Sequence, residues 1–392
     1  MAFKIQTHTE VTQVTTLQNT SIGIMNWGQN NSFPQTLINF IAQSPCAKTA
    51  VRRTKKFYCG AGFDGEDEIV SPQGLTLKNV VAICAEDYAI FEAFAIHCNF
   101  NLLGQVTSIQ PLRIAELRFN EFDELNYASK VGYHQNFGLN SEVKKQINHS
   151  VTSSSIKWID RFNPNAVTTQ IEALPNKLND YQGQVLYYSD SGHSSYPIPP
   201  LQAPINYVLS DIENSILVRK ETATGFINSY ILKSTLASTD PNLIALENAV
   251  LDAQGARGSG KIIVLSNLAP EDVQNNVLEE IGAGGSGKTP IENAMTAYDL
   301  DQKVINGVYL IPPILAGADQ KTGFSQADLA DAYFVFNSIT QSGRDTIESE
   351  LNRILKSSVF KTKSISINKL KLDIEEKSEI KPVNPIKLPS NV

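Results

Sequence analysis

A glycine-rich motif ending in lysine and threonine is the stretch of this 392-residue sequence whose residue types most directly suggest chemistry. Gly282, Gly287, Lys288 and Thr289 satisfy the pattern G-x-x-x-x-G-K-[ST]. In a P-loop, the backbone amides of this pattern hold nucleotide phosphates and its lysine reaches the terminal ones. Taken by itself, the motif predicts nucleotide binding.

The surroundings of the motif argue against a P-loop. A P-loop leaves a buried strand, whereas residues 271–280 are polar and have helical character. Pro290, which follows Thr289, has no N–H to offer a phosphate. No apolar strand ending in aspartate follows to hold magnesium, because glycine and prolines interrupt residues 304–317. We favour a flexible glycine loop and keep a P-loop nucleotide-binding protein, using residues 282–289, as an alternative.

No other set of residues predicts catalysis or metal binding. His149 and His193 lie near serines in polar loops that lack the strand-turn-helix context of a nucleophile elbow. The five histidines are scattered, and no cysteine pair has C-x-x-C spacing, so we expect buried reduced thiols. The cysteines are Cys46, Cys59, Cys84 and Cys98. The expectation is a protein that is not an enzyme and holds no cofactor or metal.

Composition and charge restrict the class of protein further. With 42% apolar and 19% charged residues, the chain can build a large core and more than one packed unit. The 33 basic residues against 40 acidic ones give a net charge of -7, which disfavours a conventional DNA-binding domain. No apolar run approaches the roughly 20 residues that span a bilayer. The polar N-terminus lacks the apolar segment of a secretory signal, so we expect cytoplasmic synthesis.

The first half of the chain predicts one α+β unit that ends near Pro200. Residues 32–57 have helical periodicity that is broken at Ser44 and Pro45, and residues 76–90 predict a second helix. Residues 91–119 have the alternation typical of strands, with Gly104 as a turn, and further strands are predicted at 155–159 and 184–188. We expect these helices to pack on a small antiparallel sheet.

The second half predicts two helices around a small insert, followed by a long helix. Ile205, Leu209, Ile212 and Ile216 have spacings of four, three and four, which predict an amphipathic helix. The insert contains predicted strands at 229–233 and 261–265 and a helix at 241–253. A returning helix is predicted at 290–306, and a long helix from Ser325, with Gly343 marking a kink or close packing.

This order of elements resembles the portal proteins of tailed double-stranded DNA bacteriophages. The order of several short motifs is more specific than any one of them. Residues 26–34 and 60–63 look like the opening of portals from phages of Bacteroidetes-type hosts. Residues 184–187, 196–199 and 225–227 are similar to the family's entry into its stem, and residues 311–317 and 346–352 to its C-terminal pattern.

The resemblance implies a ring, usually a dodecamer, at one capsid vertex of the virion. Double-stranded DNA would be packaged, retained and ejected through this ring. The implied partners are the large terminase, the head-tail adaptor, and the major capsid and scaffolding proteins, with no membrane. The implied division is a wing (1–199), a first stem helix (200–225), a clip (226–289), a second stem helix (290–306), a tunnel loop (307–324), a long kinked helix (325–356) and a C-terminal arm (357–392).

The portal interpretation assigns roles to ten residues. Asp319, Gln320 and Lys321 form the polar tip of a DNA-facing loop, where Lys321 would touch phosphate transiently. Arg257, Lys261 and Lys288 would face partners from the clip. Ile205, Leu209, Ile212 and Ile216 would pack against a neighbouring subunit, because the shorter returning helix covers only part of their stripe. A non-viral scaffold or adaptor protein, monomeric or a small oligomer, is the remaining alternative.

Overall fold

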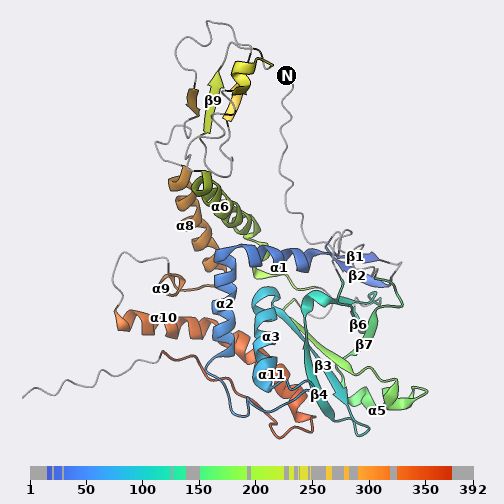
Figure 1. Cartoon of the computed structure of the whole chain (residues 1–392). Coiled ribbons are helices and arrows are strands. Elements are labelled where there is room, and N and C mark those ends of the chain that lie inside the picture. The colour runs from blue at the N-terminus through green and yellow to red at the C-terminus, as the bar shows by residue number, and fades with distance from the viewer. Residues whose placement is uncertain are drawn as a thin grey trace, which may run out of the picture.

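Two helices run side by side from a body of mixed helices and strands towards a small sheet (Figure 1). The structure is a computed structural model. It describes residues 16–19, 22–28, 31–124, 127–137, 151–191, 196–224, 229–233, 237, 239–245, 248, 262–266, 278–281, 290–317 and 325–372. The two helices are α6 (Ile205–Thr224) and α8 (Pro290–Val308), close to the predicted ranges.

The body contains a six-stranded sheet that confirms the predicted α+β class. Its strands, in spatial order, are β4 (Val106–Leu112), β3 (Ala93–Phe100), β8 (Gln184–Ser189), β7 (Lys157–Arg161), β6 (Lys130–Tyr133) and β5 (Leu117–Phe119). Only β7 and β8 pair in parallel. Gly104, at φ +74°, makes the predicted turn between β3 and β4.

Smaller sheets and short helices complete the described elements. A two-stranded sheet pairs β1 (Thr16–Asn19) with β2 (Ile24–Trp27). A three-stranded sheet has the order β10 (Ile262–Leu265), β9 (Ser229–Lys233) and β11 (Leu278–Ile281). The short helices are η1 (Ile114–Glu116), η2 (Pro164–Ala166), α5 (Val167–Glu172), η3 (Lys177–Asn179), η4 (Pro200–Gln202) and α9 (Pro313–Ala316).

The N-terminal helices follow the predicted pattern. They are α1 (Phe33–Gln43), α2 (Pro45–Cys59) and α3 (Leu77–Phe91). Pro45 ends α1 and occupies the first position of α2, where its missing N–H costs no hydrogen bond. Ser44 caps α2 by accepting a hydrogen bond from the Ala47 N–H at 3.1 Å. None of the helices in the described ranges is both long and apolar enough to cross a bilayer.

The large sheet separates two hydrophobic cores. Along β3, Ala93 and Ala95 belong to the core that contains Trp27, whereas Phe94 and Ile96 belong to the other. Successive strand residues point to opposite faces, so the alternation predicted from the sequence serves two buried faces. Helices therefore cover both sides of the sheet.

The helix predicted over residues 325–356 is two helices. They are α10 (Gln326–Ile339) and α11 (Gln341–Lys356). The helices meet at Thr340, whose hydroxyl donates to the Phe336 carbonyl at 2.7 Å. Gly343 is the site of close packing rather than the kink, because a Cβ there would clash with the ring of Tyr58.

A buried arginine fixes the junction between α10 and α11. The Arg344 side chain is fully buried, and its guanidinium donates to the Asn337 carbonyl at 2.6 Å and to the Phe57 carbonyl at 2.9 Å. These carbonyls lie in the last turns of α10 and α2, where a helix dipole favours a cation. Arg344 therefore ties the ends of two helices that are distant in sequence.

We expect Arg344→Leu to lower the free energy of unfolding by about 3 kcal/mol, because two buried carbonyls lose their donor. Chemical denaturation measures this effect. Arg353→Leu, on the same helix, is the matched control: its side chain is 54% exposed and pairs with Glu350. It should cost less than about 1 kcal/mol. Equal losses in the two variants would contradict the role given to Arg344.

Residues 357–372, here called the C-terminal strap, are extended and bound to the body. The excess of lysine and the prolines after residue 356 predict a peripheral arm, yet Ile365 and Ile367 in this part of it are buried. Side chains of the body bind the strap's backbone: Glu68 accepts from the N–H groups of Lys361 at 2.7 Å and Thr362 at 2.8 Å. Backbone hydrogen bonds hold it as well, because the N–H of Val359 donates to the Val106 carbonyl at 2.9 Å and the N–H of Asn368 donates to the Gly62 carbonyl at 3.0 Å.

We expect the strap to loosen in acid. Burial opposes ionisation of Glu68, but the hydrogen bonds from Thr362 and Lys361 outweigh it and hold the pKa of Glu68 below its usual value. A lowered folded-state pKa contributes stability above the ordinary glutamate range that is lost as the pH falls through the folded-state pKa. Glu68→Gln should therefore cost about 1 kcal/mol at neutral pH in thermal unfolding, and this cost should shrink as the pH falls below the ordinary glutamate range towards the folded-state pKa. Asp67→Asn, at the exposed neighbouring position, should show no such convergence.

Candidate assembly surface on the paired helices

A buried carboxylate on α6 joins the paired helices to the body. Asp211 is 0% exposed and accepts hydrogen bonds from the Ser44 hydroxyl at 2.5 Å and the Cys46 N–H at 3.0 Å. Both donors lie at the N-terminus of α2, where the helix dipole favours an anion. The sequence prediction did not single out Asp211. Its place three residues after the buried Val208 is the signal that puts it on the inner face of the helix.

A second buried carboxylate lies between the paired helices. Asp301 on α8 is 2% exposed and accepts a hydrogen bond from the Asn214 amide on α6 at 3.0 Å. Burial raises the pKa of Asp301, and the charge of Asp211 raises it further. The hydrogen bonds from Ser210 and Asn214 lower this pKa but do not cancel the rise. The polar contacts between α6 and α8 are therefore part of one cluster with the α2 terminus.

The groups in this cluster connect helices and do not include an activated nucleophile. Burial, followed by the charge of Asp211, raises the pKa of the Cys46 thiol to about 12. Burial likewise raises the pKa of Tyr298 to about 12. Both groups are protonated near neutral pH and supply no nucleophile. No group of three potential metal ligands occurs among the residues described above.

We expect Asp211→Asn to destabilise the fold by about 2 kcal/mol, since the amide removes the charge at the α2 terminus and turns an N–H group towards other donors. Glu213→Gln, at an exposed position of the same helix, is the matched control and should change stability by less than about 0.5 kcal/mol. Chemical denaturation at neutral pH gives both values. An Asp211 variant as stable as the control would contradict the role of Asp211 in connecting α6 to α2.

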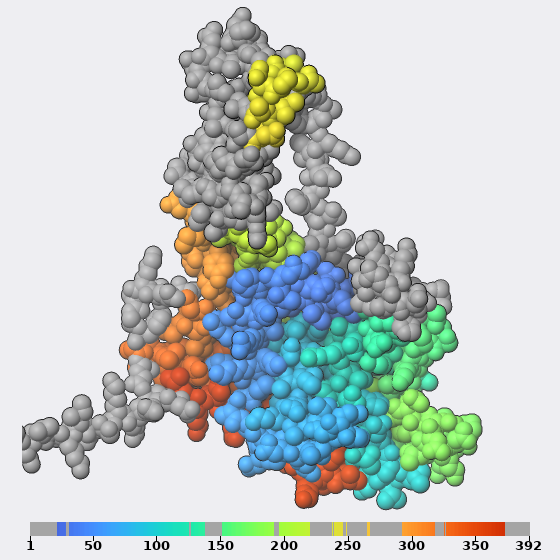
Figure 2. All heavy atoms as spheres, in the orientation of Figure 1, coloured from blue at the N-terminus to red at the C-terminus, as the bar shows by residue number. Residues whose placement is uncertain are grey.

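The outer half of the helix pair exposes apolar side chains. On α6, Ile216, Leu217 and Val218 are 37–38% exposed, and on α8, Met295 and Leu300 are 62% and 53% exposed. Figure 2 shows α8 in orange beside the yellow-green of α6. A partner can cover exposed apolar side chains of this kind, and we call these five residues together the helix-pair surface.

Two of the four residues predicted to face a neighbouring subunit are buried within this chain instead. Ile205 is 7% and Ile212 is 9% exposed, because α6 begins against the core of the body. Leu209 is half-buried, and Ile216 belongs to the helix-pair surface. Of the four residues, Ile216 near the distal end of α6 is therefore the most exposed to a neighbouring subunit. Contact with such a subunit stays a prediction.

The structure does not describe the other six predicted site residues. Asp319, Gln320 and Lys321, and likewise Arg257, Lys261 and Lys288, lie outside the described ranges. The first part of the predicted tunnel loop, residues 307–317, is packed rather than looped. Tyr309 is buried and donates to the Ala89 carbonyl at 3.0 Å, and α9 follows it.

One objection to the P-loop was wrong. Strand β11 ends at Ile281, directly before the glycine motif, so a strand does precede it. The chain is antiparallel to β9 there, at an edge of the small sheet. Helix α8 begins at Pro290, as expected, and the objection based on its missing N–H remains. The motif itself, residues 282–289, lies outside the described ranges.

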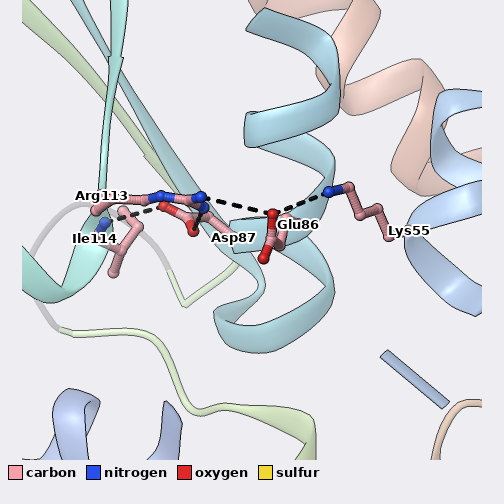
Figure 3. A network of polar contacts seen from close by, with 5 residues as sticks. All are labelled: Lys55, Glu86, Asp87, Arg113 and Ile114. Atoms are coloured by element: carbon pink, nitrogen blue, oxygen red, sulfur yellow. Dashed lines mark hydrogen bonds and ion pairs between the residues drawn. The ribbon is translucent and has the colours of Figure 1, made fainter. Parts of the chain in front are cut away.

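A charged network joins α2, α3 and the start of η1 (Figure 3). Glu86 binds Lys55 at 2.9 Å, and Arg113 lies between Glu86 at 3.6 Å and Asp87 at 2.9 Å. Burial raises the pKa of Asp87 to about 6, although the charge of Arg113 and the hydrogen bond from the Ile114 N–H act to lower it. Glu86, Asp87 and Arg113 line a cavity of about 340 Å³, and each charge of the network has a partner of opposite sign. Its role is to position the two helices.

The fold is shared with a protein of a particle neck. It is similar to one chain of the neck of an empty gene transfer agent (GTA) particle computed with C6 symmetry, with a TM-score of 0.50 and 12% identity over 90% of this chain and 86% of that chain. A chain from the virion of a native GTA particle is 13% identical at a TM-score of 0.49, with the same coverage. An HK97-family phage portal protein from Corynebacterium diphtheriae is 12% identical at a TM-score of 0.41, over 80% of this chain and 89% of that chain. No protein-family model and no curated protein matches the sequence.

Proposed function

We propose that the chain is a portal protein, the head-tail connector at the capsid portal vertex of a tailed double-stranded DNA bacteriophage. The observation that carries the proposal is the fold shared with a chain of a particle neck over 90% of this sequence. The order of the sequence motifs supports the proposal independently, because it resembles the order in portal proteins from phages of Bacteroidetes-type hosts. In this role the protein is structural rather than enzymatic, is made in the host cytoplasm and becomes part of the virion.

In the proposed assembly, copies of the chain form a closed ring, for which we favour a dodecamer. The C6 symmetry used for the similar neck supports a cyclic arrangement. The helix-pair surface would be covered by the next subunit, so that exposed apolar side chains such as Met295 and Leu300 are buried on assembly. A heterologous contact of this kind closes into a ring without leaving an exposed end.

The ring would conduct DNA during packaging, retain it and release it at ejection. The net charge of -7 in each copy suits this task, since an acidic channel repels phosphate and lets a duplex slide. Residues 319–321 would contact DNA at a loop tip. Arg257, Lys261 and Lys288 would face the large terminase and the head-tail adaptor, and the wing would meet the major capsid and scaffolding proteins.

Nucleotide binding at residues 282–289 is the second candidate function, because a strand, β11, ends directly before the motif. The proline at the start of α8 argues against it. Calorimetry with magnesium and ATP decides the matter, and we expect no binding.

The ring can be tested on the purified full-length protein by electron microscopy and sedimentation. We expect rings with a central hole from the wild type and subunits or small oligomers from Ile216→Asp, because a charge in a closed apolar contact must be desolvated without a partner. Leu103→Asp is the matched control: Leu103 is 79% exposed in the turn between β3 and β4, away from the helix pair. This variant should form rings as the wild type does.

Each outcome of the ring experiment has a definite meaning. A monomeric wild type would contradict the portal proposal and favour the scaffold or adaptor alternative. Wild-type-sized rings from Ile216→Asp would retain the portal but contradict the helix-pair surface as the subunit contact.

A further inference from the structure

All the charged residues of helix α2 are basic. Its fifteen residues contain five cations, which are Lys48, Arg52, Arg53, Lys55 and Lys56, and no Asp or Glu. The opposite face, which includes Ala47, Ala50, Val51, Thr54 and Phe57, is buried. In a chain of net charge -7, this concentration of positive charge on one exposed helix face requires an explanation.

Contacts within the body account for two of the five cations. Lys55 pairs with Glu86 at 2.9 Å (Figure 3). Arg53 is half-buried beside α9, with its Nη2 4.0 Å from the position of a Cβ at Gly317. Lys48, Arg52 and Lys56 remain, and we call them the basic stripe. All three are exposed, and none pairs with a carboxylate among the described residues.

The stability of α2 does not explain the basic stripe. Its members are four residues apart, so each faces a like charge on the next turn, which disfavours the helix. Lys48 also lies near the N-terminus of α2, where the dipole disfavours a cation, while only Lys56 lies at the favourable end. Solvent and salt screen such repulsion, but a polyanion along the stripe would turn it into attraction.

We propose that the basic stripe binds the phosphate backbone of double-stranded DNA. The members rise by about 6 Å per step along α2, so flexible side chains can follow a line of phosphates. Arg52 can bind one phosphate through two N–H groups, and the lysines act as point charges. Arg53, next to Arg52 in the sequence, lies beside Gly317, which is two residues before Asp319 of the expected DNA-facing loop tip.

The choice of duplex DNA among polyanions rests on the proposed function. The blue surface of α2 lies open on the face of the body that Figure 2 shows, so no described element covers this helix there. The stripe consists only of cations, which contact phosphate without reading bases. Such a contact is strong at low salt and weak at physiological salt, which suits a duplex that has to move.

The test compares binding of the full-length protein to a short mixed-sequence DNA duplex by fluorescence anisotropy, between about 50 and 200 mM salt. The stripe variant carries Lys48→Gln, Arg52→Gln and Lys56→Gln together. The matched control makes the same change of charge at three scattered exposed lysines: Lys157→Gln, Lys177→Gln and Lys361→Gln. We expect the stripe variant to bind roughly tenfold more weakly at the lowest salt, with a log–log salt slope smaller by about one for each lost phosphate contact. The control should bind nearly as the wild type does.

Three outcomes would overturn the inference: unchanged binding by the stripe variant, equal loss in both variants, or poly-glutamate binding to the wild type at least as tightly as DNA. The last would assign the stripe to an acidic protein partner. Ring formation is measured by electron microscopy on the same samples. If rings form but the stripe variant binds DNA as the wild type does, this inference alone is contradicted. If the stripe variant loses DNA binding but no rings form, the portal proposal alone is contradicted.

Discussion

The carboxylate of Asp211 at the N-terminus of α2 is the contact on which the arrangement of helices depends. It is completely buried, and among the described residues its hydrogen-bond donors are the Ser44 hydroxyl and the N–H and thiol of Cys46 rather than a lysine or arginine. An ion is costly to bury unless hydrogen bonds and an opposing field compensate it, and a helix N-terminus supplies both. Because these donors have fixed positions, they define the angle at which α6 leaves the body more tightly than an ion pair between two long side chains.

The same principle operates with the opposite sign elsewhere in the body. Arg344 binds carbonyls at the C-terminal ends of α2 and α10, and the fully buried Arg118 donates to the carbonyls of Ala115, Leu117 and Asn31. Burial lowers the pKa of Arg118 to about 10, so the side chain remains charged near neutral pH. Distant segments are thus joined by buried charged side chains that bind backbone groups. The ion pair of Lys55 and Glu86, by contrast, is only partly buried.

The sequence could predict what local patterns determine. The break at Pro45, the turn at Gly104 and the alternation along β3 follow from the chemistry of a few neighbouring residues, and all three were correct. A kink in the helix from Ser325 was predicted, but its position at Thr340 could not be, because the contact between Arg344 and Phe57 joins segments far apart in the sequence. Burial of Ile205 and Ile212 was missed for a related reason: the surface that covers them belongs to the body, not to the returning helix alone. Strand β11 was missed because its residues are too polar to suggest one.

The body is built from two parts of the chain that the helix pair separates, and this has a consequence for synthesis. One core joins Leu37 to Phe336, and the other joins Val80 to Ile347 and Ile367. A ribosome releases the chain from the N-terminus, so neither core can close until the last of these residues have emerged. The helix pair, with its exposed apolar side chains, leaves the ribosome before the body that anchors it is complete. Nascent chains on one messenger therefore carry an exposed apolar segment before the body has folded, and any contact that buries this segment correctly has to form after translation is nearly complete.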